Sequence, residues 1–229
     1  MGHGEIKDHM FLDGLEDAYD HGKLMGVFAE NCATHYKFSR EAQDEFAIRS
    51  LERAQKATND GSFKHEITSV TVTNRKQSIE IDIDEQPQKA QPDKIPALKP
   101  AFAKDGTVTA ANASSISDGA AALTLMRRSV AEEKGLTPLA VIRGHSTFAH
   151  EPAWFTTAPV GALKMLGEKI GWDFKNVDLF KINEAFAVVT MAAMYELDLP
   201  GAKVNIHGGA CALVHSIGAS GAPILTTLL

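Results

Sequence analysis

An asparagine and a histidine near the end of the chain are residue types that can stabilise a developing negative charge. Asn183 stands in INEAFAVV (182–189), where a strand-like apolar run meets a helical pattern, and His215 stands in the glycine-rich stretch HGGACALVHSIGASGAP (207–223). A fixed amide can hold a water or a carbonyl oxygen, and a histidine can polarise a carbonyl or transfer a proton near neutral pH. The pair therefore predicts a site where a strand ends and a helix begins, the usual place for ligands in an open α/β sheet.

Each residue of this pair also has a purely structural alternative. Asn183 alone would act as a helix N-cap, with Glu184 placed favourably at the positive end of the helix dipole. His215 alone would more often be a structural histidine. The presence of INEAFA upstream of it favours the functional role.

Small residues surround both positions. Glycines at 208, 209, 218 and 221 would let backbone approach a ligand closely, and a helix starting near Ile217 would offer free N–H groups to an anion. The run TVTAANASSISDGAAALTLM (107–126) is also dense in small residues. It predicts either a tight loop before a buried strand or a surface along which a narrow ligand lies.

Local signals predict the elements of the first half. Ser39 is a good N-cap for a helix that should end at 59–61, where Asn-Asp-Gly follows the last apolar position. The alternating stretches 68–72 and 78–84 predict a hairpin with its turn at 74–77. Four prolines without periodicity in 85–100 predict a surface loop.

Strand and helix patterns alternate in the second half. Apolar runs predict strands at 122–126, 139–148, 177–182 and 203–206, and helical patterns follow them at 127–135, from Pro159 and from 183 to 199. This alternation predicts an α/β layer with a largely parallel sheet.

Composition limits the classes of function. The 229 residues are 44% hydrophobic and 23% charged, as in ordinary globular proteins, and the net charge of -6 argues against a nucleic-acid binder. No apolar run approaches the roughly 20 residues that span a bilayer, and the first ten residues lack a secretory pattern. Cys32 and Cys211 are too few and too far apart for a disulfide framework or a metal site. We expect a cytoplasmic protein without a metal and without a membrane partner.

The ordered set of motifs resembles the thiolase family, of the acetyl-CoA acetyltransferase type. The stretches that carry the resemblance are GTVTAANASSISDGAAALTLM (106–126), INEAFAVV (182–189) and NIHGGACALVHSIGASGA (205–222), with weaker support from 24–33, 39–50 and 99–108. The resemblance implies an α/β fold of two similar halves, packed as layered sheets and helices, with an inserted loop domain. On this map residues 1–108 are the loop domain, which binds coenzyme A and carries an oligomerisation excursion near its start. Residues 109–135 end the N-terminal half, and residues 136–229 form an incomplete C-terminal half.

The resemblance also implies roles for single residues. Asn183 would fix a catalytic water, and His215 would complete an oxyanion hole for the acyl-CoA thioester with that water and help to activate the nucleophile. Ser114 would contact the pantetheine arm. The residues that would line the coenzyme A and acyl pocket are Met25, Ala110, Phe102, Phe186 and Leu15.

The reaction that the resemblance implies is condensation of two acetyl-CoA molecules to acetoacetyl-CoA, or the reverse thiolysis. Coenzyme A thioesters would be substrates, with no permanently bound cofactor, and the family forms homo-oligomers, typically tetramers.

The chain departs from the family pattern at its cysteines and around its histidine. The family needs a nucleophilic and an acid/base cysteine, and neither Cys32 nor Cys211 falls at those positions, so both are expected to be packing residues. The family's G-H-P-I-G-A-S-G-A-R reads V-H-S-I-G-A-S-G-A-P here, with Val214 for glycine, Ser216 for proline and Pro223 inside the expected helix. Leu24 replaces a histidine found in some relatives.

Three hypotheses follow from these departures. In the first, the chain is a thiolase shortened at both ends and inactive alone. In the second, it is a non-catalytic fragment that binds coenzyme A or oligomerises. In the third, a separate chain supplies the missing parts. In every case we expect exposed sheet edges and apolar faces that favour association.

Overall fold

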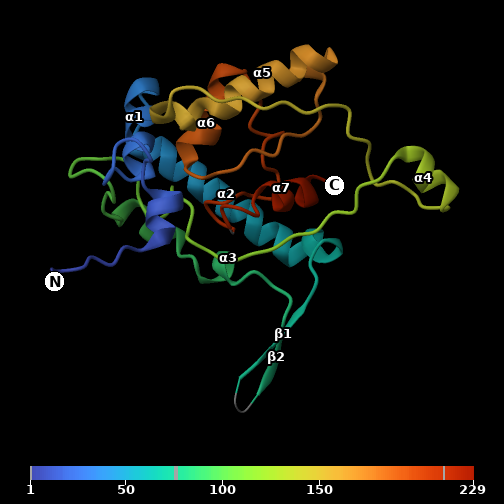
Figure 1. Cartoon of the computed structure of the whole chain (residues 1–229), viewed down its shortest axis with the longest axis horizontal. Helices are drawn as coiled ribbons and strands as arrows, with labels where there is room; N and C mark the ends of the chain where they lie inside the picture. The colour runs from blue at the N-terminus through green and yellow to red at the C-terminus, as the bar shows by residue number, and fades with distance from the viewer. Residues whose placement is uncertain (1, 75–76, 214) are drawn as a thin grey trace.

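The computed structural model describes residues 2–74, 77–213 and 215–229. Helices and a small hairpin account for its named elements (Figure 1), which are α1 (Met25–Tyr36), α2 (Arg40–Asp60), β1 (Val70–Thr73), β2 (Ser78–Ile81), α3 (Glu85–Lys89), α4 (Arg128–Glu133), α5 (Ala158–Ile170), α6 (Ala187–Glu196) and α7 (Gly221–Leu228). In this part of the chain no helix is both long and apolar enough to cross a bilayer.

The main core forms where α1 and α6 pack together. Ala29 and Cys32 of α1 lie against Val188 and Ala192 of α6, and all four side chains are fully buried. Such small side chains let two helices approach closely, because little volume separates their backbones. Figure 1 shows α2 crossing below these helices, with α5 and α6 above it.

Helix α2 forms as its local signals predict. The Ser39 hydroxyl accepts a hydrogen bond from the Ala42 N–H at 3.1 Å, and Gly61 ends the helix with a φ of 81°. The side chain of Arg53 donates to the carbonyls of Val204 at 2.7 Å and Gly201 at 2.9 Å. Helix α2 is therefore tied to the segment that leads into the glycine-rich loop.

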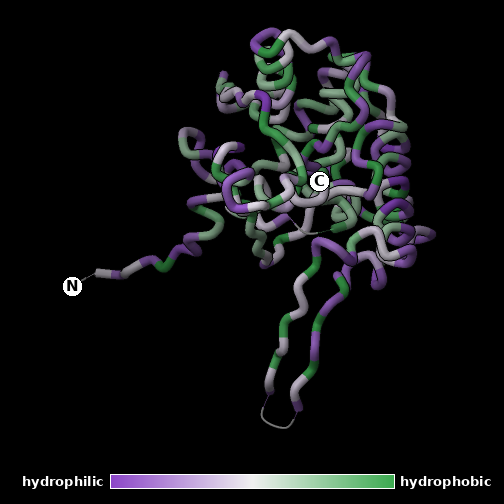
Figure 2. Tube along the Cα trace, turned by 90° about the vertical axis from the view of Figure 1, so that its right-hand side faces the viewer, coloured by the Kyte–Doolittle hydropathy of each residue, from purple (hydrophilic) through white to green (hydrophobic). Residues whose placement is uncertain are grey.

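The predicted hairpin is confirmed. Strands β1 and β2 are antiparallel, with Val70 opposite Ile81 and Val72 opposite Ile79. Their side chains are exposed, and Figures 1 and 2 show the hairpin projecting away from the rest of the chain. Residues 75–76 of the expected turn lie outside the described residues.

The segment 85–100, predicted to be a surface loop, is mostly exposed but contains two short helices. Helix α3 and a 3₁₀ helix (Pro92–Ala97) form there. Asp84 caps α3 by accepting from the Gln86 N–H at 2.9 Å, and Pro87 falls in the first turn of α3. Proline is tolerated in a first turn because the N–H groups there have no helical partner.

The expected strands at 122–126 and 139–148 do not form. Both segments are extended without ladder partners among the described residues, and Leu125 and Leu139 are 68% and 86% exposed. The strands expected at 177–182 and 203–206 meet in one parallel bridge, between Phe180 and Val204. An apolar run becomes a strand only beside another strand, and the run itself does not say where its partner is.

Candidate active site

Asn183 lies in an extended segment ahead of α6. The helix begins at Ala187, with Phe186 at the N-cap position in an extended conformation (φ -141°, ψ 154°). The predicted alternative of Asn183 as the cap of this helix is therefore wrong. Its side chain is half-buried and does not cap α6, so it can contact another segment of the chain.

Backbone contacts with the small-residue run hold this segment in place. The Ser114 N–H donates to the Ala185 carbonyl at 3.0 Å, and the Ala187 N–H donates to the Asn112 carbonyl at 2.8 Å. An isolated antiparallel bridge joins Ala113 and Phe186. The first part of 107–126 is therefore a loop against the extended segment, but the buried strand expected after that loop does not form, and a ligand surface along this run remains a prediction.

The structural alternative placed Glu184 at the positive end of the helix dipole. This expectation is wrong, because α6 begins three residues later, at Ala187, and the Glu184 side chain makes other contacts. Its carboxylate is fully buried and accepts hydrogen bonds from the Ser50 hydroxyl at 2.7 Å and the Asn205 amide at 2.7 Å. The backbone N–H of Cys211 donates to it at 3.1 Å. Glu184 thus ties the segment of Asn183 to α2 and to the glycine-rich loop.

Two of the four glycines are required by this packing. Gly208 has a φ of 78°, and a β-carbon there would meet backbone of Ser50 and Ala54. A β-carbon on Gly209 would collide with the Glu184 carboxylate. Gly218 and Gly221 have open space around them. The need for glycine at 208 and 209 therefore comes from the buried carboxylate and α2.

The glycine-rich loop brings His215 to Asn183. The Nδ2 of Asn183 lies 3.4 Å from the Nδ1 of His215, and the Ser220 hydroxyl lies 2.6 Å from the same ring nitrogen. Burial lowers the pKa of His215 from its ordinary value of 6.5, so the ring is neutral near pH 7. A neutral imidazole beside an amide is suited to hydrogen bonding with a carbonyl oxygen or a water.

The helix after His215 begins later than expected. Helix α7 starts at Gly221 rather than near Ile217, which places Pro223 in its first turn. Pro223 therefore removes no helical hydrogen bond, because an N–H in the first turn has no helical partner. Val214, which stands where the family pattern has glycine, lies outside the described residues.

Three of the predicted pocket residues lie together. The rings of Phe102 and Phe186 meet edge to face at 6.1 Å, and Met25 packs against the same core cluster. The Phe102 ring covers Gly26, where a β-carbon would overlap it. Ala110 is exposed in a turn, and Leu15 is half-buried at the end of a π-helical turn (Phe11–Leu15). The ligand contacts expected of all five residues remain predictions.

Neither cysteine is placed as a nucleophile. Burial raises the pKa of the Cys32 thiol, which lies in the α1–α6 core. Burial, with the nearby Glu184 carboxylate, raises the pKa of the Cys211 thiol well above its ordinary value. Both thiols stay protonated at neutral pH, whereas the thiolate is the reactive form.

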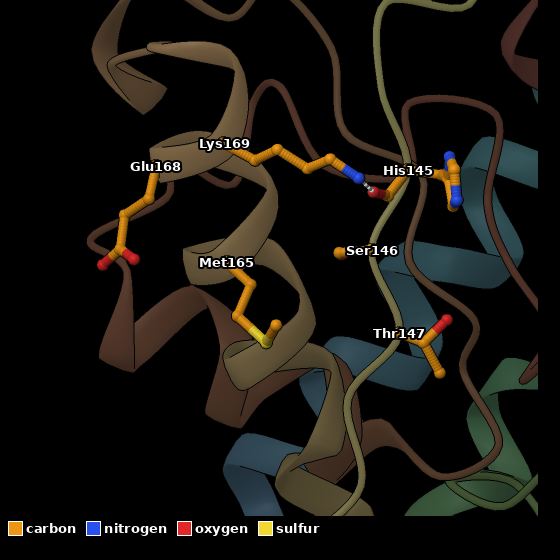
Figure 3. A pocket seen from close by; sticks show the side chains of 6 residues that line it. All are labelled: His145, Ser146, Thr147, Met165, Glu168 and Lys169. Atoms are coloured by element: carbon orange, nitrogen blue, oxygen red, sulfur yellow. Dashed lines mark hydrogen bonds between the residues drawn. The ribbon is translucent and has the colours of Figure 1, made fainter.

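A surface hollow of about 480 Å³ lies elsewhere on the molecule. Figure 3 shows it between α5 and the extended segment at 145–147, where the Lys169 ammonium donates to the His145 carbonyl at 2.9 Å. Its lining residues are His145, Ser146, Thr147, Met165, Glu168 and Lys169. None of the predicted site residues lines it.

Ser50, Asn205 and Ser220 also support the site, although none of them was predicted from the sequence. Ser220 carried no signal for its contact with His215, because a helix expected from near Ile217 placed Ser220 inside that helix. Ser50 and Asn205 carried none, since their partner Glu184 is 134 and 21 residues away along the chain.

Comparison with known families shows the family to which this chain belongs. A sequence model described as "Thiolase, N-terminal domain" matches residues 1–129, and one described as "Thiolase, C-terminal domain" matches residues 136–229. The chain belongs to the thiolase family. The predicted resemblance is confirmed.

Relatives with curated names are similar along this whole thiolase chain. It is 47% identical to the cytosolic acetyl-CoA acetyltransferase of Mus musculus, covering 100% of this chain and 58% of that protein. It is 46% identical to a probable acetyl-CoA acetyltransferase of Dictyostelium discoideum, covering 99% of this chain and 55% of that protein. The chain thus spans somewhat more than half the length of these thiolases.

Solved thiolase structures share the fold. The acetyl-CoA acetyltransferase of Bacillus anthracis superposes with a TM-score of 0.95 at 42% identity, over 100% of this chain and 58% of that one. A thiolase from Ascaris suum in complex with coenzyme A superposes with a TM-score of 0.92 at 41% identity, over 100% of this chain and 60% of that one. The predicted fold class, an incomplete thiolase fold, is confirmed, although the described residues form only isolated parallel bridges of the expected sheet.

Proposed function

We propose that this chain supplies the coenzyme A-binding surface and one oxyanion site of an acetyl-CoA acetyltransferase. The observation that carries the proposal is the approach of Asn183 to His215, 3.4 Å apart and on separate segments. The reaction is the condensation of two acetyl-CoA molecules to acetoacetyl-CoA or its reversal by thiolysis. The 41–47% identity to proteins named for this chemistry supports the choice of substrate.

Each residue contributes through its own chemistry. The neutral His215 ring donates a hydrogen bond to the thioester oxygen as negative charge develops there, and the Asn183 amide fixes a water that does the same. Ser114 contacts the pantetheine arm beside the segment of Asn183. The apolar surface of Met25, Phe102 and Phe186 receives the arm, with Ala110 and Leu15 at its margin.

The 229-residue chain is inactive alone under this proposal. Claisen condensation through an acyl-enzyme needs a thiolate nucleophile and a second acid/base group. The two cysteines present have raised pKa values and lie in packing positions. The ring and the amide can therefore bind and polarise a thioester without turning it over.

Three further features belong to the proposal. Residues 1–108 act as the coenzyme A-binding loop domain, 109–135 end the N-terminal half, and 136–229 belong to the C-terminal half. The protein forms homo-oligomers, tetramers in the family. It acts in the cytoplasm, which the names of the Mus musculus and Rattus norvegicus relatives support.

A second candidate function is a non-catalytic module that binds coenzyme A or oligomerises. The observation that favours it is the raised pKa of both thiols beside an intact cluster of Met25, Phe102 and Phe186. A third candidate function is that of a half-enzyme completed by a separate chain. The exposed apolar segment at 139–142 favours this candidate, because a second chain could cover it. Activity gained on mixing with a chain that carries the upstream cysteine would support the third candidate, and no gain would remove it.

Calorimetry with coenzyme A tests the binding part of the proposal. We expect saturable binding by the unaltered chain and at least tenfold weaker binding by Met25→Lys, which places a charge on the proposed pocket. Met165→Lys is the matched control, because Met165 lines the other hollow and is 45% exposed. Absence of binding by the unaltered chain, or weaker binding only in Met165→Lys, would overturn the proposed site.

A further inference from the structure

Ser220 stands where serines usually cap helices, yet its hydroxyl faces elsewhere. It directly precedes α7 and is 7% exposed, and among the described residues its side chain makes no cap bond. Ser39, before α2, makes that bond from an extended backbone with ψ of 165°. The backbone of Ser220 is already helical, with φ of -56° and ψ of -29°. Its hydroxyl instead lies 2.6 Å from Nδ1 of His215.

The surroundings of Nδ1 define the direction of that hydrogen bond. The Asn183 amide nitrogen lies 3.4 Å from the same ring nitrogen, and an amide nitrogen is only a donor. A protonated Nδ1 would point its N–H at the Asn183 N–H, which cannot accept, even if the Ser220 hydroxyl turned to accept from the ring. A serine hydroxyl can rotate to donate, so the consistent arrangement has Nδ1 unprotonated and accepting.

We propose that Ser220 is a positioning residue that donates its hydroxyl proton to Nδ1 of His215 and thereby keeps the single ring proton on Nε2. Burial favours the neutral ring, which carries one N–H. With the proton on Nε2, the ring presents a donor on the side away from Ser220. That donor is what an oxyanion site requires. The catalytic meaning of the tautomer rests on the proposed function, but the tautomer itself does not.

Nitrogen-15 NMR of histidine-labelled protein at about pH 8 measures the tautomer, because the ring is then neutral. Protonated and unprotonated ring nitrogens have widely separated chemical shifts. The sequence contains 9 histidines, so loss of one signal pair in His215→Gln assigns it. We expect Nε2 to be protonated and Nδ1 unprotonated in the unaltered chain. A protonated Nδ1 would overturn the proposal without any variant.

Three serine variants complete the test. Ser220→Ala should raise the Nδ1–H fraction of His215 several-fold, and Ser220→Thr, which keeps a hydroxyl, should restore the original spectrum. Ser216→Ala is the matched control, because its buried hydroxyl in the same loop has no hydrogen-bond partner among the described residues. Unchanged shifts in Ser220→Ala, or an equal change in Ser216→Ala, would also overturn the proposal.

This experiment separates the two claims. It needs neither coenzyme A nor turnover. A chain that fails to bind coenzyme A yet shows the Nε2–H tautomer supports the role of Ser220 while the proposed function fails. A chain that binds coenzyme A with Nδ1 protonated retains the function and loses this inference.

Discussion

Glu184 joins three other parts of the chain from a fully buried position. Ser50 belongs to α2, Asn205 precedes the glycine-rich loop, and Cys211 lies within that loop. Buried carboxylates are tolerated where hydrogen bonds satisfy their oxygens. Because Asn183 is the neighbouring residue, the same contacts fix the backbone that carries the site.

Removing this carboxylate should destabilise the chain strongly. In Glu184→Ala the donors on Ser50, Asn205 and Cys211 lose their acceptor, and we expect the free energy of unfolding to fall by about 3 kcal/mol. Urea denaturation followed by circular dichroism measures it. Glu45→Ala, at an exposed position of α2, should change it by less than about 0.5 kcal/mol. Equal effects of the two substitutions would contradict the assigned role of Glu184.

The histidines make stability depend on pH. Burial lowers the pKa of His215, and burial with the nearby Lys181 charge lowers the pKa of His207. The unfolded chain then binds more protons than the folded one, so stability is fully present above about pH 6.5 and is lost as pH falls through the folded pKa values. We expect a shallower loss in His215→Gln, measured by denaturation at a series of pH values. Stability that rises on acidification would contradict these directions.

At the scale of elements, the sequence correctly predicted the helix and the hairpin that are stabilised by contacts between residues close together in the chain. Helix α2 has its own cap and its own C-terminal glycine, and the hairpin alternates as its pairing requires. The prediction of strands at 122–126 and 139–148 was wrong, because an apolar run does not indicate whether a neighbouring strand is available to pair with it. The late starts of α6 and α7 were missed because long-range contacts hold residues 183–186 and 215–220 outside the helices.

The cap of α2 offers a direct test at this scale. Ser39→Ala removes the acceptor for the Ala42 N–H, and we expect it to lower the free energy of unfolding by about 1 kcal/mol. Thermal and urea denaturation measure the change. Ser69→Ala, at an exposed position before the hairpin, is the comparison. If Ser39→Ala proves as neutral as Ser69→Ala, the cap does not stabilise α2.

At the scale of the whole molecule, apolar side chains remain in contact with water. Leu139 and Ile142 in the extended segment are 86% and 62% exposed, and Val70 and Ile81 of the hairpin are 60% and 47% exposed. Exposed apolar stretches of this kind mark surfaces that associate. The family relationship could be predicted from ordered motifs, whereas the extent of this exposure required the structure.

We expect the purified chain to associate in a concentration-dependent way. The double substitution Leu139→Lys with Ile142→Lys should reduce the mean mass in light scattering, because it places two charges on the extended segment. Lys104→Leu, at an exposed position elsewhere, should not reduce it. A monodisperse monomer that melts cooperatively would show that the exposed segment does not drive association.

Under the proposed function, this chain binds a coenzyme A thioester beside Asn183 and His215 but has no cysteine placed to attack it. The most direct measurement is coenzyme A-dependent thiolysis of acetoacetyl-CoA by the purified chain beside His215→Ala. We expect no turnover by either protein, since both cysteines stay protonated in packing positions. Turnover by the unaltered chain that disappears in His215→Ala would contradict the claim and show that the chain contains a complete catalytic site.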